Sequence, residues 1–385
     1  MTTTVNNEHK NIKVPNLRFK EFEGEWKEER LADIADLYKG TGISKDQLSD
    51  DGEPCILYGE LYTKYKSETI REVISKTNIN NTKLVRSKAN DVIIPCSGET
   101  AEDIATARCV LNGNILLGGD LNIIRLHGYD GAFMSYQLNG RRKYDIAKVA
   151  QGVSVVHLYG EHLKGVKTIN PCLEEQKKIA KLLSLLDERI ATQNKIIDKL
   201  QSLIKGIRND VFGKLRKSIG FNAMISDVLC YEQPQPYIVE DTEYTAGGTP
   251  VLTANKAFVL GYTSETDGIY DKGDCIIFDD FTLDCKYVDF PFKVKSSAIK
   301  ILTAKNKELL RYTFEFLKYL DLSTDEHKRH YIAETQNQEF ILPTTQIVRT
   351  IAHAFSTLSS RMQTIVKQRD MLELQKQYLL RQMFI

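Results

Sequence analysis

One motif in the chain has the residue types of a metal-dependent nuclease. Asp284-Cys285-Lys286 follows the D-x-K order, in which a carboxylate holds the metal and a lysine stabilises negative charge on the phosphate. A second metal ligand would come from an upstream acidic residue, Asp274, Asp279 or Asp280. Such residues are present in any acidic loop, so the motif keeps a self-contained nuclease open as an alternative function without establishing it.

The other chemical motifs argue against catalysis. Asn170-Pro171-Cys172-Leu173 resembles the N/D-P-P-F/Y box of amino-methyltransferases, but it lacks the second proline and the aromatic residue, and no glycine-rich loop precedes it. We interpret it as the N-terminus of a helix, where proline is favoured. No G-x-x-x-x-G-K-[ST] loop is present, which excludes a nucleotide-driven motor in this chain. The seven histidines form no i, i+4 pair, and we expect no metal site.

Length and composition limit the fold class and the compartment. A chain of 385 residues is expected to form two or three domains, and 42% hydrophobic with 27% charged residues are typical of globular proteins. Seven cysteines without C-x-x-C spacing disfavour a disulfide framework and a zinc cluster, and they suit a reducing cytoplasm. No apolar stretch approaches about 18 residues and the first residues lack an apolar segment, so we expect neither a membrane span nor a secretory signal. The net charge of +1 neither requires nor excludes a nucleic-acid partner.

A heptad pattern predicts a long helix over residues 171–214. Apolar residues recur at alternating steps of four and three, which is the seam of a coiled coil. Pro171 precedes the helix, and Glu174 and Glu175 fall in its first turn, where the helix dipole favours negative charge. Gln193 is the polar exception in the seam, and it either fixes the register or faces water. The apolar seam positions are Ile179, Leu183, Leu186, Ile190, Ile197, Leu200, Ile204, Ile207 and Val211.

The same pattern recurs 172 residues later, over residues 343–385. Without a gap, Pro171 matches Pro343, and several polar residues recur in the same register. Two unrelated amphipathic helices would share the period but not these identities, so we infer an internal duplication. Arg369 and Lys376 are the polar seam residues here, and we expect them to reach solvent at the end of the rod or to meet a partner. The apolar seam positions are Ile351, Phe355, Leu358, Met362, Ile365, Leu372, Leu379 and Met383.

Short apolar runs ahead of each helix also correspond to one another. Leu31–Ile34 resembles Ile225–Val228. Residues 54–58 resemble 250–254, and residues 88–94 resemble 271–277; both pairs read as strands and turns. The predicted fold class is therefore α+β, with two mixed, mainly β domains and two long helices that pair as an intramolecular, antiparallel coiled coil with pseudo-two-fold symmetry. The predicted boundaries are an N-terminal tail 1–14, a first domain 15–170, a first helix 171–214, a second domain 215–342 and a second helix 343–385.

The function of such a pair of helices follows from what they would hold. A heptad helix leaves its seam uncovered unless another helix packs on it, and the nearest available partner is the other copy in the same chain. An antiparallel pair would carry one domain at each end at a fixed separation, which suits the reading of DNA. Apolar residues off the seam would then either form a second face for partner helices or pack on the chain's own domains. These residues are Leu182, Leu203, Val366, Leu374 and Tyr378.

The helix entry P-x4-Q-(K/R)-x-I-A is duplicated, at residues 171–180 and, in degenerate form, at 343–352. With this duplicated entry, the chain from about Pro15 onward resembles a specificity (S) subunit of a type I restriction–modification enzyme. The run QGVSVVHLY at residues 151–159 is typical of the end of the first recognition domain in these subunits, and residues 97–104 resemble one of its loops. The second copy departs from the pattern, because it lacks the acidic pair of the helix entry and a recognisable QG-x-S run.

The resemblance implies a function without chemistry in this chain. Each globular domain would be a target recognition domain that reads one half of a bipartite, asymmetric sequence in double-stranded DNA, and the helical rod would set the spacer. Two modification subunits would dock on the helices and methylate adenine at N6, and two motor–nuclease (restriction) subunits would join them. S-adenosylmethionine, ATP and Mg²⁺ would be used by those partners, so we expect no cofactor here. A coiled-coil adaptor without DNA contacts remains a further alternative.

Candidate DNA-binding residues are polar, basic and aromatic side chains on predicted loops, because base reading needs donors and acceptors and phosphates need lysine or arginine. Packing in a core or plain exposure to solvent is the alternative for each of them. In the first domain they are Tyr58, Tyr62, Lys64, Lys66, Ser97, Glu99, Thr100, Arg108, Gln151 and Ser154. In the second domain they are Thr253, Asn255, Lys256, Thr282, Lys286, Arg329, His330 and Tyr331.

Overall fold

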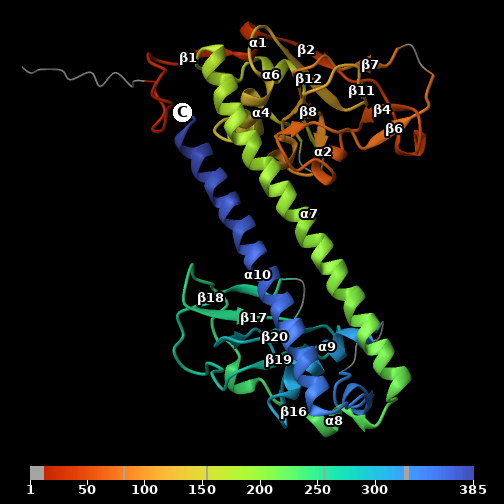
Figure 1. The fold of residues 1–385 in the computed structure, drawn as a ribbon. Helices are drawn as coiled ribbons and strands as arrows, with labels where there is room; N and C mark the ends of the chain where they lie inside the picture. The colour runs from red at the N-terminus through yellow and green to blue at the C-terminus, as the bar shows by residue number, and fades with distance from the viewer. Residues whose placement is uncertain (1–12, 81–82, 153–154, 255–256, 325–328) are drawn as a thin grey trace, which may run out of the picture. The chain divides into compact units, whose positions relative to one another are not determined.

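The chain divides into two compact units, each of which contains parts of both long helices. The computed structural model describes residues 13–80, 83–152, 155–254, 257–324 and 329–385 (Figure 1). Unit 1 comprises Met1–Gln193 and Gln368–Ile385, and unit 2 comprises Asn194–Lys367.

Unit 1 is built on a five-stranded sheet in the order β2-β12-β8-β10-β5. Its central strand β8 carries the apolar run Val92–Ile94 and is buried on both faces. Val92 and Ile94 point to a core shared with Phe133 of helix α4, whereas Ile93 points to a core shared with Ile56 of a second sheet, β3-β6-β4-β11-β7. The main strands are β2 (Ala35–Lys39), β12 (Leu121–Leu126), β8 (Asp91–Pro95), β10 (Arg108–Val110) and β5 (Thr69–Ile70), and α4 is Gly131–Asn139. The second sheet contains β3 (Leu48–Ser49), β6 (Ser75–Thr77), β4 (Glu53–Ile56), β11 (Leu116–Leu117) and β7 (Val85–Arg86).

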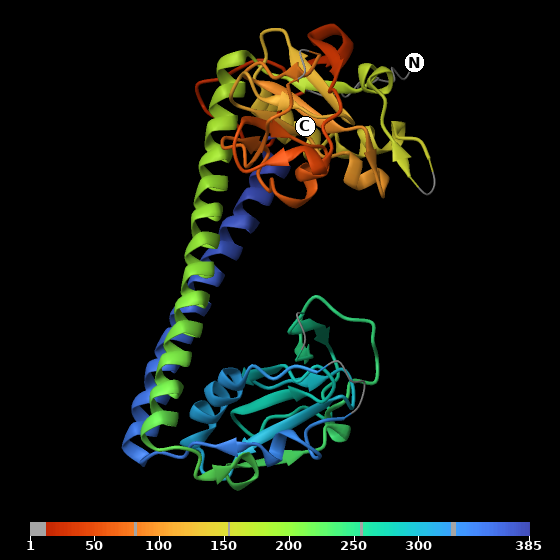
Figure 2. The same ribbon diagram turned by 90° about the vertical axis from the view of Figure 1, so that its right-hand side faces the viewer.

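Unit 2 repeats this arrangement with fewer strands (Figure 2). Its main sheet has the order β16-β22-β19-β20, which matches β2-β12-β8-β10 of unit 1 strand for strand. Ile276 and Phe278 of β19 share a core with Phe316 of helix α9, and Ile277 faces the smaller sheet. The elements are β16 (Leu229–Glu232), β22 (Ile299–Ala304), β19 (Cys275–Asp279), β20 (Cys285–Val288) and α9 (Leu309–Leu320), with β18 (Val259–Thr263), β17 (Thr249–Leu252) and β21 (Lys293–Val294) in the smaller sheet.

The correspondences predicted ahead of the helices are confirmed as equivalent elements. Leu31–Ile34 and Ile225–Val228 are the short helices α1 and α8. The second pair contains β4 and β17, and the third contains most of β8 and β19. In each unit a short strand before the α1 or α8 helix pairs with the strand that leads into a long helix: β1 (Lys27–Arg30) with β14 (Lys167–Asn170), and β15 (Ala223–Met224) with β23 (Glu339–Phe340). The α+β fold class with an internal duplication is thereby confirmed.

The two long helices are α7 (Leu173–Ser218) and α10 (Thr345–Gln382), so the first helix continues beyond the predicted end at residue 214. In unit 1, Ile179 and Leu183 of α7 share a core with Met383, which directly follows α10. In unit 2, Phe212 of α7 shares a core with Val348 of α10. Within each unit the segments of α7 and α10 therefore pair in the antiparallel sense, as predicted, and none of the predicted apolar seam residues is exposed.

The prediction that Lys376 reaches solvent at the end of the rod or meets a partner is wrong. For the off-seam residue Leu182, packing on the chain's own domain is the alternative that holds. Lys376 is largely buried in unit 1, where its Nζ lies 2.6 Å from Asp187 Oδ1 and 2.5 Å from Glu68 Oε2. Arg369 pairs with the neighbouring Asp370 at 2.7 Å. Leu182 packs against the core of unit 1. Within the described residues no helix has the length and apolar character needed to cross a membrane.

Candidate nucleic-acid interface

Three predicted recognition segments of unit 1 lie together where β8 ends. The strand β9 (Ser97–Gly98) directly follows this end and pairs with β13 (Val156–His157). The hydroxyl of Tyr62, on helix α2 (Glu60–Thr63), donates to the Ser97 carbonyl oxygen at 3.2 Å. The structure thus brings residues of the segments 58–66, 97–100 and 151–157 to one end of the sheet.

The polar loops at this end are held by local hydrogen bonds that leave side chains exposed. The Thr100 hydroxyl oxygen accepts from the backbone N–H of Asp103 at 3.0 Å and so caps helix α3 (Ala101–Ile104). Glu99 and Thr100 are exposed. Gln151 is also exposed, and its backbone N–H and carbonyl both pair with His157, at 2.9 and 2.7 Å. Ser154 lies outside the described residues.

The aromatic and basic candidates of unit 1 divide into outward and inward side chains. Tyr58 is 39% exposed, and Lys66 is exposed with its Nζ donating to the Tyr62 carbonyl oxygen at 3.1 Å. Burial raises the pKa of Tyr62, which keeps the hydroxyl a neutral donor to Ser97. Lys64 forms an ion pair with Glu60 at 2.7 Å.

Arg108 has its contacts inside the domain. Its Nε donates to the Tyr65 carbonyl oxygen at 3.2 Å, and its Nη1 donates to the Ala107 carbonyl oxygen at 3.0 Å. Desolvation lowers the pKa of this guanidinium, although the nearby carboxylates of Glu68 and Asp187 oppose that shift. With these contacts, the Arg108 side chain stabilises the inside of the domain and does not extend towards a DNA phosphate.

Unit 2 has an equivalent end of its sheet, after β19. There the His330 backbone N–H donates to the Asp280 carbonyl oxygen at 3.1 Å, as the Leu158 N–H does to the Cys96 carbonyl oxygen at 2.8 Å in unit 1. Because Asp280 and Cys96 each directly follow the equivalent strands, the segment around residue 330 takes the place of the end of the QGVSVVHLY run. The missing QG-x-S motif in the second domain is therefore a change of sequence and not a loss of this connection.

The turn after β19 presents an aromatic side chain that the sequence reasoning missed. The Asp279 carboxylate accepts from the backbone N–H groups of Phe281 and Thr282, both at 2.9 Å, and this fixes the turn. Phe281 is 37% exposed and Thr282 is exposed. Arg329 is exposed as well, and its Nη2 donates to the Ser297 hydroxyl at 3.3 Å. The only signal for Phe281 in the sequence is an aromatic residue inside an acidic turn.

Two predicted DNA contacts of unit 2 are wrong, because their side chains are inside the domain. Tyr331 is 1% exposed and its ring packs edge-on against Phe278, with centroids 5.4 Å apart. His330 is 2% exposed and its Nδ1 lies 2.8 Å from Glu334 Oε2. Thr253 is half-buried, with its N–H donating to the Phe258 carbonyl oxygen at 3.0 Å. Asn255 and Lys256 lie outside the described residues.

The residues of the nuclease alternative do not form a metal site. Asp284 Oδ1 accepts from Lys318 Nζ at 2.6 Å, and Asp284 Oδ2 lies 3.1 Å from Lys286 Nζ. Burial acts to raise the pKa of Asp284, but the two lysines outweigh it and the pKa is lowered. Asp274 instead accepts from the Tyr287 hydroxyl at 2.7 Å. Across the described ranges, no three His, Cys, Asp or Glu side chains are grouped so as to hold a metal ion.

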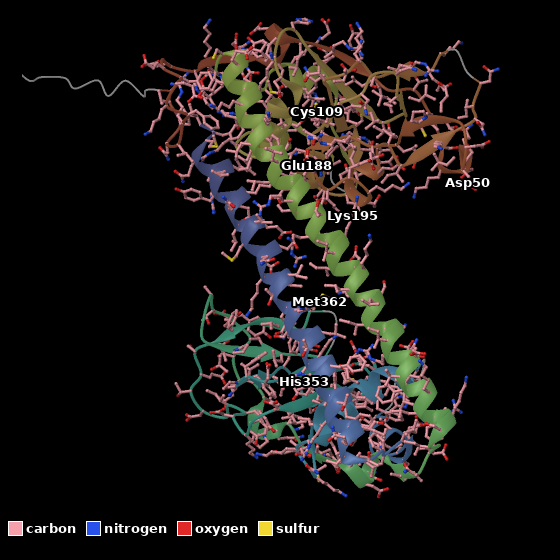
Figure 3. All side chains as sticks on the ribbon, in the orientation of Figure 1. Asp50, Cys109, Glu188, Lys195, His353 and Met362 are labelled. Carbon is pink, nitrogen blue, oxygen red and sulfur yellow. The ribbon has the colours of Figure 1, made fainter. Side chains whose placement is uncertain are left out.

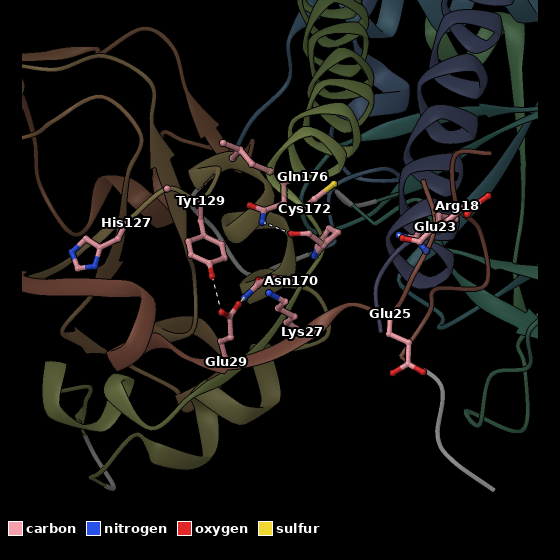
Figure 4. A pocket seen from close by; sticks show the side chains of 13 residues that line it. Arg18, Glu23, Glu25, Lys27, Glu29, His127, Tyr129, Asn170, Cys172 and Gln176 are labelled. Atoms are coloured by element: carbon pink, nitrogen blue, oxygen red, sulfur yellow. Dashed lines mark hydrogen bonds between the residues drawn. The ribbon is translucent and has the colours of Figure 1, made fainter. Parts of the chain in front are cut away.

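A cavity of about 470 Å³ lies at the start of α7 in unit 1 (Figure 4). Its polar groups join β1, β14 and α7: Glu29 accepts from the Tyr129 hydroxyl at 2.8 Å and from Asn170 Nδ2 at 3.1 Å. Gln176 Nε2 donates to the Pro171 carbonyl oxygen at 2.9 Å. The Asn170-Pro171 motif therefore sits at a helix N-terminus, as interpreted from the sequence.

The part of the chain that contains this interface in unit 1 is similar to a known protein family. Residues 23–202 match the family model described as "Type I restriction modification DNA specificity domain". This part of the chain is similar to the specificity domain that the family model describes. It contains β8, the β9–β13 pair that follows its end, and the first part of α7. The convergence of the recognition segments thus falls inside the matched region.

Two proteins that are similar to this chain are named as type I specificity subunits. The chain is 44% identical over 126 residues to the type I restriction enzyme EcoR124I/EcoR124II specificity subunit of Escherichia coli, covering 31% of either chain. It is 28% identical over 202 residues to the MjaVIII specificity subunit of Methanocaldococcus jannaschii, covering 51% of this chain and 45% of that protein. The chain thus matches less than half the length of either relative. The crystal structure of the S subunit of a type I system from M. genitalium has a similar fold, with a TM-score of 0.69, 17% identity, and coverage of 97% of this chain and 99% of that one.

Proposed function

We propose that the chain is the non-catalytic DNA specificity subunit of a type I restriction–modification complex. The domain of unit 1 reads one half of a bipartite, asymmetric target in double-stranded DNA, the domain of unit 2 reads the other half, and the long helices set the spacer. The observation that carries the proposal is the convergence of three recognition segments at the end of β8, inside the specificity domain, with an equivalent end after β19 in unit 2. Exposed donors, acceptors and aromatic rings at one end of a sheet suit base reading.

The partners in this proposal are modification and restriction subunits. Met371, Leu374 and Tyr378 recur at helical spacing on α10 and are 70%, 62% and 54% exposed. An apolar stripe of this kind on a helix whose seam is already covered supports docking of a partner helix. We propose two modification subunits as its occupants, with two motor–nuclease subunits joining them in the cytoplasm. S-adenosylmethionine, ATP and Mg²⁺ belong to those subunits in this proposal.

Exchange of the first domain tests the proposal. Residues 15–170 are replaced by the corresponding domain of another type I specificity subunit, and N6-methyladenine is mapped in cells that also contain the modification subunits. We expect one half of the methylated sequence to change while the other half and the spacer stay the same. An unchanged methylated sequence would support the adaptor alternative instead.

A further inference from the structure

A buried charge cluster in unit 1 joins both long helices to the recognition domain. Lys376 of α10 lies between Asp187 of α7 and Glu68, a loop residue that directly precedes β5. The side chains of all three are largely buried, with 14%, 7% and 12% exposed. Asp187 Oδ2 also accepts from the Tyr136 hydroxyl at 2.6 Å and from the Ser67 hydroxyl at 2.9 Å.

The segment 67–71 is thereby fixed to α7 along its length. Besides the Ser67 bond to Asp187, Arg71 Nη2 donates to the Ser184 hydroxyl at 3.3 Å. Arg71 also forms an ion pair with Glu188, which is labelled on α7 in Figure 3. Among the residues named in these contacts, Lys376 alone belongs to α10. Its ion pair with Glu68 joins α10 to the segment that α7 also holds.

The fixed segment continues directly into the candidate recognition residues. Glu68 is two residues beyond Lys66, and the helix α2 with Tyr62 precedes both. The Glu68 carbonyl oxygen accepts from the Cys109 N–H at 2.8 Å, and neighbouring Arg108 donates to the Tyr65 carbonyl oxygen at 3.2 Å. These bonds form a short, continuous connection from Lys376 to the Tyr62–Ser97 contact at the end of β8.

We propose that Lys376 is a positioning residue for DNA reading by the first domain. By pairing with both Glu68 and Asp187, it holds segment 67–71 on α7 and so sets the place of α2 relative to β9. This inference rests on the proposed function, since it concerns how the same surface reads DNA. A residue of the last helix thus determines how accurately the first domain reads its half of the target.

Charge, and not packing alone, is what the position requires. Without Lys376, the two buried carboxylates would lose the one cation that pairs directly with both, and like charges in a low dielectric repel strongly. The segment 67–68 would then move away from α7 to bring Glu68 into water. Arginine at position 376 keeps the charge and can reach both carboxylates, whereas methionine keeps most of the volume and loses the charge.

The test uses the full-length chain assembled with its modification subunits and duplex DNA with the sequence methylated by the wild type. Binding is measured on duplexes with base changes in one target half at a time, and the half read by the first domain is assigned by the exchange of residues 15–170. We expect Lys376→Met to reduce discrimination in that half by about tenfold and to leave the other half unchanged. Lys376→Arg restores it, and Lys367→Met, at an exposed lysine of the same helix, has no effect.

A milder variant covers the case in which Lys376→Met does not fold. Ser67→Ala removes one hydrogen bond of the same clamp, and we expect a smaller loss of discrimination confined to the same half. Equal weakening of both halves, or unchanged discrimination in folded Lys376→Met protein, would overturn the positioning role. Absence of any sequence preference in the wild-type assembly would instead overturn the proposed function, and the inference with it.

Discussion

The two units attach their globular domains to the long helices with charge clusters of opposite sign. In unit 1 one cation, Lys376, lies between the carboxylates of Asp187 and Glu68. In unit 2 one carboxylate, Glu315 of α9, accepts from Arg208 of α7 at 2.7 Å and from Arg311 at 2.6 Å. Four strands of the main sheet have the same order in both units, so the duplication has kept the core of the fold and inverted the chemistry of the attachment.

Equivalent positions of the two long helices show how far the inversion goes. Asp187 and Ser359 are related by the 172-residue repeat. Asp187 accepts from Tyr136 of α4, whereas Ser359 bonds with Arg311 of α9, the equivalent helix. One equivalent position of the long helices thus contacts the equivalent helix of each domain, through side chains that are not interchangeable. Different charge arrangements therefore attach the two domains to their helices.

The largest effect expected from this comparison is the loss of the single carboxylate of unit 2. Glu315 is 1% exposed, and Glu315→Gln leaves Arg208 and Arg311 without a counter-charge. We expect the unfolding free energy of unit 2 to fall by about 3–5 kcal/mol, because breaking a buried ion pair leaves an uncompensated charge. Urea unfolding followed by hydrogen exchange, resolved by unit, measures the change.

Glu308→Gln is the matched control for that variant. Glu308 lies just before the same helix and pairs at the surface with Arg349 at 2.7 Å. Exposed pairs of this kind contribute little, so we expect no resolvable change. Equal effects of the two substitutions would show that the buried cluster does not attach unit 2 to its helices.

The connections that follow β8 in unit 1 and β19 in unit 2 also differ, and this difference predicts an effect on DNA binding. The turn of unit 2 between β19 and β20 is short and presents Phe281, whereas the equivalent connection of unit 1 contains β9 and α3. We expect Phe281→Ala to weaken binding about tenfold, since contact of an aromatic ring with bases is worth about 1–3 kcal/mol. Phe290→Ala, which alters an equally exposed ring after β20, is the control and leaves binding unchanged. Equal losses would remove Phe281 from the interface.

The smallest expected effect is on stability in acid. It differs between the β1–β14 pair of unit 1 and the β15–β23 pair of unit 2. Hydrogen bonds from Lys13 and Lys167 lower the pKa of Glu28 from 4.5 to about 2. A lowered pKa contributes stability above pH 4.5 that is lost as the pH falls towards 2. We expect Glu28→Gln to flatten the pH dependence of the urea midpoint of unit 1 over this range. In the β15–β23 pair of unit 2, Ala223 lies opposite Phe340. We therefore expect the urea midpoint of unit 2 to depend on pH in the same way in the wild type and in the Glu28→Gln variant.

The repeat was the part of the fold that could be predicted from the sequence. A heptad pattern is a local property, and its recurrence at a fixed offset marks equivalent segments without any knowledge of contacts. The runs that contain parts of β8 and β19 were recognised by their similarity, at an offset of 183 and not 172 residues. In unit 1 the loop after β8 and the run 151–159 were also predicted as recognition segments, because they resemble runs of type I specificity subunits.

The rest depended on contacts between distant residues. In the sequence, Lys376 is a polar residue in an otherwise apolar seam. Its partner Glu68 is 308 positions away in the chain, so the sequence gives no sign of the pair. Tyr331 and His330 follow a basic run that suggested DNA contact, but the aromatic core of unit 2 buries the tyrosine against Phe278. Which face a tyrosine takes depends on tertiary packing, which sequence periodicity does not contain.

The most direct test of the account is the reciprocal exchange, in which residues 215–342 are replaced by the second domain of a type I specificity subunit. N6-methyladenine is then mapped across the genome of cells that carry this chain and the modification subunits. The account predicts that the target half left unchanged by the exchange of residues 15–170 now changes, while the other half is retained. A change in both halves, or in the same half as before, would contradict the assignment of one unit to each half.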